Sequence, residues 1–220
     1  MEITKYLLAI IGGYLLGSLS MSILLSRSVL GGDVRKKGSG NAGATNMARV
    51  YGMKAGALTL AGDVAKSALA MLIGWLLLGD NGLAASGIAC VIGHCFPVYH
   101  NFKGGKGVSV GAAIALAVDW KVFLCVVGTF LLMALLSKKV SLGSICAAIS
   151  ITVAALAFQV SPPRLVLCIV GMVLVIFQHR ENIKRLINGT EADFCPAKTT
   201  KEPPKKLPKK APKRKTKDII

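Results

Sequence analysis

Three polar, glycine-rich segments interrupt an otherwise apolar chain, and each carries side chains that can bind an anion. They read GSGNAGATN at 38–46, GHCFPVYHNFKGGKG at 93–107 and HRENIKRLINGTE at 179–191. Glycine leaves backbone N–H groups accessible, and several such groups can converge on one anion. The three segments therefore predict the binding of phosphate or a similar anion.

The candidate anion-binding residues of the first segment are glycines and small polar residues: Gly38, Ser39, Gly40, Asn41, Gly43, Thr45 and Asn46. A helix that starts directly after the glycines would add its dipole and would place Asn46 and Arg49 on one face. The alternative is a solvated loop in which Ser39 and Asn41 cap that helix. The glycines match G-x-G-x-x-G, but no strand precedes them, which excludes a dinucleotide-binding fold.

The second segment ends an apolar run at His94 and then places Lys103, Gly104, Gly105 and Lys106 in a row. Two lysines on a glycine loop can bind one phosphate from both sides. The segment lacks the G-x-x-x-x-G-K-[ST] pattern of a P-loop. Lysines that only fix the membrane topology are the alternative.

The third segment closes the last apolar run. His179 and Asn182 are three residues apart, so a helix would point both toward the bundle. The neighbouring Arg180, Lys184 and Arg185 are also typical of plain interface anchors. We therefore expect His179 and Asn182 in the site, while both interpretations stay open for the three basic residues.

Seven apolar segments connect and position the polar ones. We interpret them as membrane-spanning helices, each of which needs about twenty residues to cross the hydrocarbon of a membrane. The candidate spans are residues 3–25, 55–78, 83–98, 108–118, 122–136, 142–159 and 165–177. The first lacks the basic start and small-residue exit of a cleaved signal peptide, so we interpret it as a span. The fourth is short, and only residues 119–121 separate it from the fifth. The sequence predicts an all-α integral membrane protein, a bundle of about seven transmembrane helices.

Lysine and arginine residues of the connecting segments gather on one side of this bundle, which places the amino terminus outside and the carboxyl terminus in the cytoplasm. All three polar segments then face the cytoplasm. Residues 1–195 form the predicted transmembrane domain. Residues 196–220, rich in lysine and proline, are expected to form a basic disordered tail on anionic membrane lipids. Nucleic-acid binding is not expected, because no aromatic residues stand among these lysines.

Asp63 and Lys66 are charged residues three positions apart inside the second apolar segment. Charges within a membrane are costly and usually face a partner or a wet cavity. A structural ion pair and the floor of the site are both open interpretations. The six cysteines form no C-x-x-C pair, so we expect neither disulfides nor a metal site, and no cofactor is expected.

Taken together, the three polar segments closely resemble the signature motifs of the bacterial acyl-phosphate:glycerol-3-phosphate acyltransferase family, over residues 1 to about 195. This resemblance implies transfer of a fatty acyl group from acyl phosphate to the 1-position hydroxyl of sn-glycerol 3-phosphate. The products would be lysophosphatidic acid and phosphate, in the first acylation of phospholipid synthesis. The family also implies a multi-pass protein of the bacterial cytoplasmic membrane with its motifs facing the cytoplasm.

By matching position, the resemblance implies these polar site residues: Ser39, Thr45, Asn46, Arg49, His94, Lys103, Lys106, His179, Asn182 and Glu191. For catalysis we expect Ser39, Arg49, Lys106, His179 and Asn182. The others are expected to bind substrate, together with Gly38, Gly40, Asn41, Gly43, Gly104 and Gly105.

The expected chemistry is direct attack of the acceptor hydroxyl on an already activated acyl phosphate, because positioning and charge stabilisation can supply most of the acceleration. We expect Lys103, Lys106 and Arg49 to hold phosphates, and backbone N–H groups near Gly38–Gly43 to receive the oxyanion or the leaving phosphate. Either His179 or a substrate phosphate oxygen would take the proton. A covalent intermediate on Ser39 is the rival mechanism. A transporter for a phosphorylated anion and a membrane scaffold are the alternative functions.

Overall fold

The structure, a computed structural model, describes residues 1–195. All regular secondary structure in these residues is helical. The elements are α1 Glu2–Ser18, α2 Met21–Ser28, η1 Val34–Lys36, α3 Ala44–Tyr51, α4 Met53–Cys95, η2 Val98–His100, α5 Val108–Val118, α6 Trp120–Ser137, α7 Val140–Ala157, α8 Pro162–Gln178 and α9 Arg180–Ile187. The predicted basic tail at 196–220 lies outside the described residues, so its disorder and lipid contacts stay predictions.

Helix α4 is a hairpin, because its two arms meet at a sharp break. Leu78 and Gly79 leave helical geometry there, and Gly79 adopts a positive φ of 58° that suits glycine. The arms pack backbone to backbone: a Cβ on Gly74 would lie 2.2 Å from the carbonyl oxygen of Gly82. One continuous element thus accounts for the predicted segments 55–78 and 83–98.

The helices confirm the predicted all-α membrane bundle. Four helical stretches are long and apolar enough to cross a membrane: Glu2–Ser28, Met53–His100, Trp120–Ser137 and Val140–Ala157. Helices α8 and α9, bent by 58° at their junction, make a fifth candidate. Helix α5 spans only about 16 Å at 1.5 Å per residue, roughly half of the hydrocarbon thickness. The count of seven passes and the orientation of the termini stay predictions.

The first apolar segment is not one straight helix, contrary to its uninterrupted appearance in the sequence. Helix α1 ends at Ser18 and α2 begins at Met21. The ammonium group of Lys66 donates hydrogen bonds to the carbonyl oxygens of Gly17, at 2.9 Å, and of Leu19. These carbonyls lie at the end of α1, where no intrahelical donor is available.

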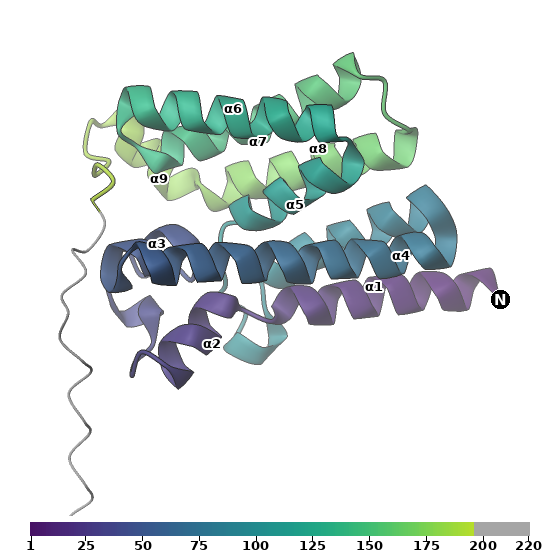
Figure 1. Ribbon diagram of the computed structural model, residues 1–220, viewed down its shortest axis with the longest axis horizontal. Helices are drawn as coiled ribbons and strands as arrows, with labels where there is room; N and C mark the ends of the chain where they lie inside the picture. Colours follow the sequence, from purple (N-terminus) through teal and green to yellow (C-terminus); the bar gives the residue numbers. More distant parts are fainter. Residues whose placement is uncertain (196–220) are drawn as a thin grey trace, which may run out of the picture.

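The bundle has two layers (Figure 1). Helix α1 lies along α4, the group of α6, α7 and α8 forms the other layer, and α5 lies between the layers. The α1–α4 contact is close, since a Cβ on Gly17 would lie 2.2 Å from the carbonyl oxygen of Cys90. Helices α3 and α9 gather at the end of the bundle opposite the amino terminus. The first and third polar segments therefore lie at the same end of the bundle.

Candidate active site at one end of the bundle

A cavity of about 1140 Å³ joins the three polar segments. All of the predicted site residues except Lys103 line it. Its apolar continuation runs between the helices and is lined by Ile114, Val126, Val127, Phe130, Leu131, Ala147, Ala148, Ile151, Gly171, Met172 and Val175. The cavity can therefore hold a molecule that is charged at one end and hydrocarbon at the other.

Asn46 holds the first polar loop in shape. Its amide nitrogen donates to the carbonyl oxygens of Val34, Lys37 and Asn41 at 2.9–3.2 Å, and its Oδ1 accepts from the N–H of Ser39 at 2.9 Å. The side chain is buried. Asn46 was expected to bind substrate, but its amide is used by the loop itself.

Two of the backbone donors expected near Gly38–Gly43 are used inside this loop. The N–H of Ser39 bonds Asn46, and the N–H of Gly40 bonds the carbonyl of Lys37, so neither is available to an anion. Helix α3 begins at Ala44 after Gly43, and its first-turn N–H groups have no intrahelical acceptor. Because this helix start lines the cavity, its N–H groups are available to an anion bound there.

Replacing Asn46 by aspartate is expected to lower kcat/KM at least tenfold and to reduce thermal stability. The carboxylate would face three carbonyl oxygens without a donor, and an unsatisfied buried polar group costs about 1–3 kcal/mol. Thermal unfolding in detergent and initial rates measure both effects. Asn188→Asp, an exposed site after α9, is the matched control. Unchanged rates for Asn46→Asp would contradict the structural role of Asn46.

The second polar loop folds back onto the end of α4. The N–H of Gly104 bonds the carbonyl of Cys95, and that of Gly105 bonds the carbonyl of His94 at 3.0 Å. A Cβ on Gly104 would lie 2.1 Å from the His94 carbonyl oxygen, so only glycine fits. From α8, the amide of Gln178 donates to the Gly105 carbonyl at 3.2 Å.

Arg35 ties the first loop to the second. Its Nη1 donates to the carbonyl oxygens of His100 and Lys103, at 2.9 and 3.2 Å. Asp33 holds the guanidinium at 2.9 Å and has a lowered pKa, chiefly because of its hydrogen bond from Arg35. The two loops are therefore fixed relative to one another.

The structure separates the two lysines that were expected to share one phosphate. Lys106 lines the cavity, whereas Lys103 is exposed and does not. Gly104 and Gly105, which lie between the two lysines, press against the end of α4. Only Lys106 is placed to bind a ligand inside.

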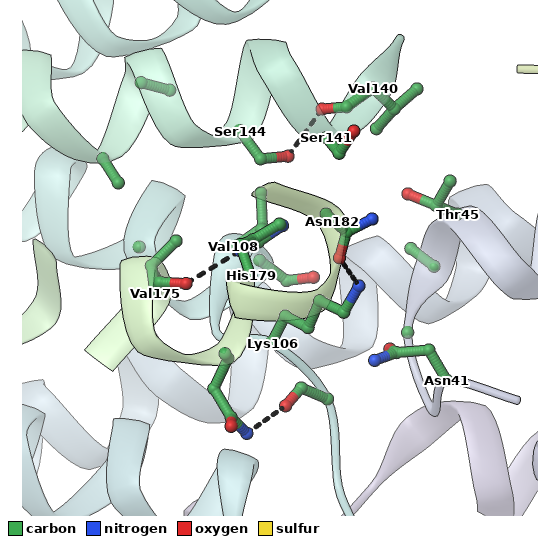
Figure 2. A pocket seen from close by; sticks show the side chains of 18 of the residues that line it. Asn41, Thr45, Lys106, Val108, Val140, Ser141, Ser144, Val175, His179 and Asn182 are labelled. Carbon is green, nitrogen blue, oxygen red and sulfur yellow. Dashed lines mark hydrogen bonds between the residues drawn. The ribbon is translucent and has the colours of Figure 1, made fainter. Parts of the chain in front are cut away.

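A chain of hydrogen bonds crosses the polar end of the cavity. Lys106 donates to Oδ1 of Asn182 (Figure 2). The Asn182 amide donates to Glu191 at 2.6 Å. Arg185 donates to the other oxygen of Glu191 at 2.7 Å. Arg49 lines the same cavity and forms no ion pair within residues 1–195. Positive charge therefore exceeds negative charge here.

The protonation states of Lys106 and Glu191 in this hydrogen-bonded network follow from their surroundings. Burial, followed by the positive charge of Arg185, lowers the pKa of Lys106 to about 8, although Glu191 acts in the opposite direction. Burial acts to raise the pKa of Glu191, but the nearby Ser141 hydroxyl and the hydrogen bonds from Arg185 and Asn182 outweigh it, so the pKa is lowered. Near neutral pH the site presents an ammonium group next to an ionised carboxylate.

His179 lies at the bend between α8 and α9 and is buried. Its Nδ1 lies 2.8 Å from the carbonyl oxygen of Val175 (Figure 2). A carbonyl only accepts, so Nδ1 carries the proton and Nε2 has the free lone pair. The ring can therefore accept a proton or a hydrogen bond at Nε2.

Several lining residues were missed by the sequence reasoning. Gln178 supports the second loop, and Ser141 lies on the opposite wall of the cavity. Gln178 directly precedes the third polar segment. Its position as a polar residue at the end of an apolar helix could have indicated that it belongs to the site. Ser141 stands alone near the start of α7, where nothing in the pattern points to a site. Arg185 lines the cavity and bonds Glu191, which supports its role in the site over a plain anchor.

Comparisons with known proteins agree with this architecture. The family model described as glycerol-3-phosphate acyltransferase matches residues 7–189. The chain is 42% identical to the glycerol-3-phosphate acyltransferase of Syntrophotalea carbinolica over 196 residues, covering 87% of this chain and 98% of the relative. It is 45% identical to that of Pseudomonas paraeruginosa over 190 residues, covering 86% and 99%.

A solved crystal structure of PlsY (YgiH), an integral membrane glycerol 3-phosphate acyltransferase in its glycerol 3-phosphate form, superposes with a TM-score of 0.82. The two chains are 38% identical, and the match covers 86% of this chain and 96% of the other. The lysophosphatidic acid form superposes with a TM-score of 0.80. Sequence and fold thus agree over almost all of the described residues. The chain belongs to the glycerol-3-phosphate acyltransferase family.

Proposed function

We propose that this protein transfers a fatty acyl group from acyl phosphate to the 1-position hydroxyl of glycerol 3-phosphate, forming lysophosphatidic acid and inorganic phosphate. The observation that carries the proposal is one cavity with a cationic end and an apolar end. The glycerol 3-phosphate and lysophosphatidic acid forms of the PlsY structures support the acceptor and the product. Glycerol-3-phosphate acyltransferase activity follows from family membership. The part that this proposal adds is the identity of the acyl donor, acyl phosphate.

The reaction balances without a covalent enzyme intermediate. The acceptor hydroxyl oxygen attacks the acyl carbonyl carbon, a new C–O bond forms, and the C–O bond to phosphate breaks. The bonding electrons leave with the phosphate. Either Nε2 of His179 or a phosphate oxygen of the acceptor takes the proton of the hydroxyl. Phosphate in a mixed anhydride is already a good leaving group, so positioning and charge stabilisation supply the acceleration.

Lys106, Arg49 and the start of α3 hold the two phosphates in this proposal. All three line the polar end of the cavity, and a helix N-terminus attracts anions. Asn182 orients Lys106, while Glu191 and Arg185 keep Asn182 in place. The acyl chain then extends between α5, α6, α7 and α8.

Ser39 is a poor candidate for a covalent nucleophile. It is exposed, and its side chain has no hydrogen-bond partner among residues 1–195 that could remove its proton. A nucleophilic serine needs an adjacent base. We therefore propose direct transfer, with Ser39 binding substrate at the mouth of the cavity.

We further propose that the polar end faces the cytoplasm of a bacterial inner membrane. The basic residues of the connecting segments favour that side, and soluble glycerol 3-phosphate would reach the cavity from there. The membrane lipids would receive the product on the same side.

A donor comparison tests the proposed function. Purified protein receives radiolabelled glycerol 3-phosphate with acyl phosphate, acyl-CoA or acyl carrier protein in parallel. We expect labelled lysophosphatidic acid with acyl phosphate alone. Equal rates with a thioester donor would contradict the proposed donor, and uptake into vesicles without conversion would support a transporter instead.

The kcat/KM for glycerol 3-phosphate is expected to fall about tenfold for each pH unit above 8, because the free enzyme then loses the proton of Lys106. The substrate cannot cause this decrease, since the second pKa of a phosphate monoester is about 6. Initial rates from pH 6 to 10 measure the effect. A Lys106→Met variant should lack this alkaline decrease, and an identical pH profile in that variant would assign the decrease to another group.

A further inference from the structure

Lys66 lies beneath the second polar loop, outside the cavity wall, and is buried among helices. Its ammonium group donates to the carbonyl oxygens of Gly17 and Leu19 and to Nδ1 of His94 at 3.2 Å. These three acceptors use all three of its protons. Asp63, which is 1% exposed, places Oδ1 3.0 Å from the same nitrogen and balances its charge.

This contact determines which nitrogen of His94 carries the proton. An ammonium group only donates, so Nδ1 accepts and the proton of the neutral ring resides on Nε2. His94 is 3% exposed and lines the cavity. Within residues 1–195, Nε2 bonds no protein acceptor. The ring thus presents a free N–H donor.

The free donor points at the second polar loop. A Cβ on Gly105 would lie 2.2 Å from Nε2 of His94 and 3.1 Å from the carbonyl oxygen of Ala42 in the first loop. The donor therefore reaches the cavity where the two loops meet. A side chain on Gly105 would close this approach.

We infer that Lys66, charge-balanced by Asp63, is a positioning residue that fixes the tautomer of His94, so that its Nε2–H donates to an anionic substrate oxygen between the two loops. The inference rests on the proposed function, since it takes a phosphorylated substrate as the ligand. A pair of charges in the bundle is expensive unless fully hydrogen-bonded. Here the ammonium group is fully hydrogen-bonded by the two carbonyls at the end of α1 and by His94. The oxygens of Asp63 accept no hydrogen bond within residues 1–195, and the Lys66 charge at 3.0 Å stabilises that carboxylate.

Nitrogen-15 NMR of histidine-labelled protein tests the tautomer directly, because the chain has three histidines. In the wild type we expect His94 to show a protonated Nε2 and an unprotonated Nδ1, assigned by loss of its signals in His94→Gln. Glycerol 3-phosphate added without any acyl donor should shift the Nε2 signal. In Lys66→Met the tautomers should mix, and that shift should weaken.

Kinetics provide the second readout. Lys66→Met is expected to lower kcat/KM on the order of tenfold to a hundredfold, the range for losing one hydrogen bond to a charged group. Lys66→Arg should restore both the tautomer and most of the rate. In a His94→Gln background, where the amide keeps a donor near the Nε2 position, removing Lys66 should cost less.

Arg164→Met is the matched control for losing an ion pair. Arg164 pairs with Asp80 at 2.8 Å, at the break of α4 and away from the polar loops. Its loss should lower thermal stability and leave the His94 tautomer unchanged.

A wild-type His94 protonated at Nδ1 would overturn the inference, as would an unchanged tautomer and rate in Lys66→Met. If Lys66→Met does not fold, the His94 tautomer in the wild-type spectrum and the tautomer and rate of Lys66→Arg still test the inference. Failure of the acyl phosphate proposal would show only in the donor comparison, since the NMR titration needs no donor.

Discussion

Replacing Lys106 by methionine is expected to lower kcat/KM for glycerol 3-phosphate about a thousandfold, the upper range for losing one preorganised donor in an active site. Methionine has a similar length and no charge, so the loop keeps its packing. The variant removes the cation that bonds Asn182 and lines the polar end of the cavity. It also leaves the buried oxygen of Asn182 without that donor.

Lys103→Met on the same loop is the control for this prediction. Lys103 is exposed and does not line the cavity, so its loss should change kcat/KM less than about threefold. Initial rates and thermal unfolding of both variants should be measured together. A Lys106→Met protein that retains wild-type stability and a near wild-type rate would remove Lys106 from the mechanism.

Replacing Ile151 by tryptophan is expected to lower kcat/KM for long-chain acyl phosphates about tenfold to a hundredfold while sparing short-chain donors. On α7, Ser144 borders the polar end, and Ile151 lies two turns, or about 10 Å, further along the apolar continuation. Extra side-chain volume in a packed site costs about 1–3 kcal/mol, and only a chain long enough to reach Ile151 encounters it.

Ile149→Trp is the matched control, because Ile149 lies on the same helix, is 45% exposed and does not line the cavity. Rates with a series of acyl phosphates of increasing length measure the selectivity of both variants. Equal losses at every chain length, or equal behaviour of the two tryptophan variants, would show that the acyl chain does not run along α7.

The helices and the clustering of the polar segments were predictable from the sequence. Apolar runs gave the membrane segments, and polar, glycine-rich residues marked their ends. The basic residues of the connecting segments predicted that all three polar segments share one side, and the cavity joins all three. The boundary between residues 78 and 83 also corresponds to the break at Leu78–Gly79.

The break between α1 and α2 was not predictable, because its partner is distant in the sequence. Apolar composition alone gives no reason to end a helix at Ser18. The free carbonyls there meet Lys66 from α4, a contact that exists only after the helices pack. The same packing places Lys66 against His94, which a spacing of 28 residues does not indicate.

The roles of individual site residues depended on side-chain direction, which the sequence does not give. Asn46 was expected to bind substrate, yet its amide bonds four backbone groups of its own loop. Lys103 and Lys106 have the same chemistry and share a loop, but only Lys106 lines the cavity. Gln178 and Ser141 lie outside every conspicuous motif and became visible only as cavity walls.

Direct transfer requires both substrates in the cavity at once, and initial-rate kinetics test this most directly. Rates should be measured over a grid of acyl phosphate and glycerol 3-phosphate concentrations. Direct transfer through a ternary complex predicts double-reciprocal lines that intersect. Parallel lines, together with an acyl adduct on the protein after incubation with acyl phosphate alone, would show a covalent intermediate and contradict direct transfer.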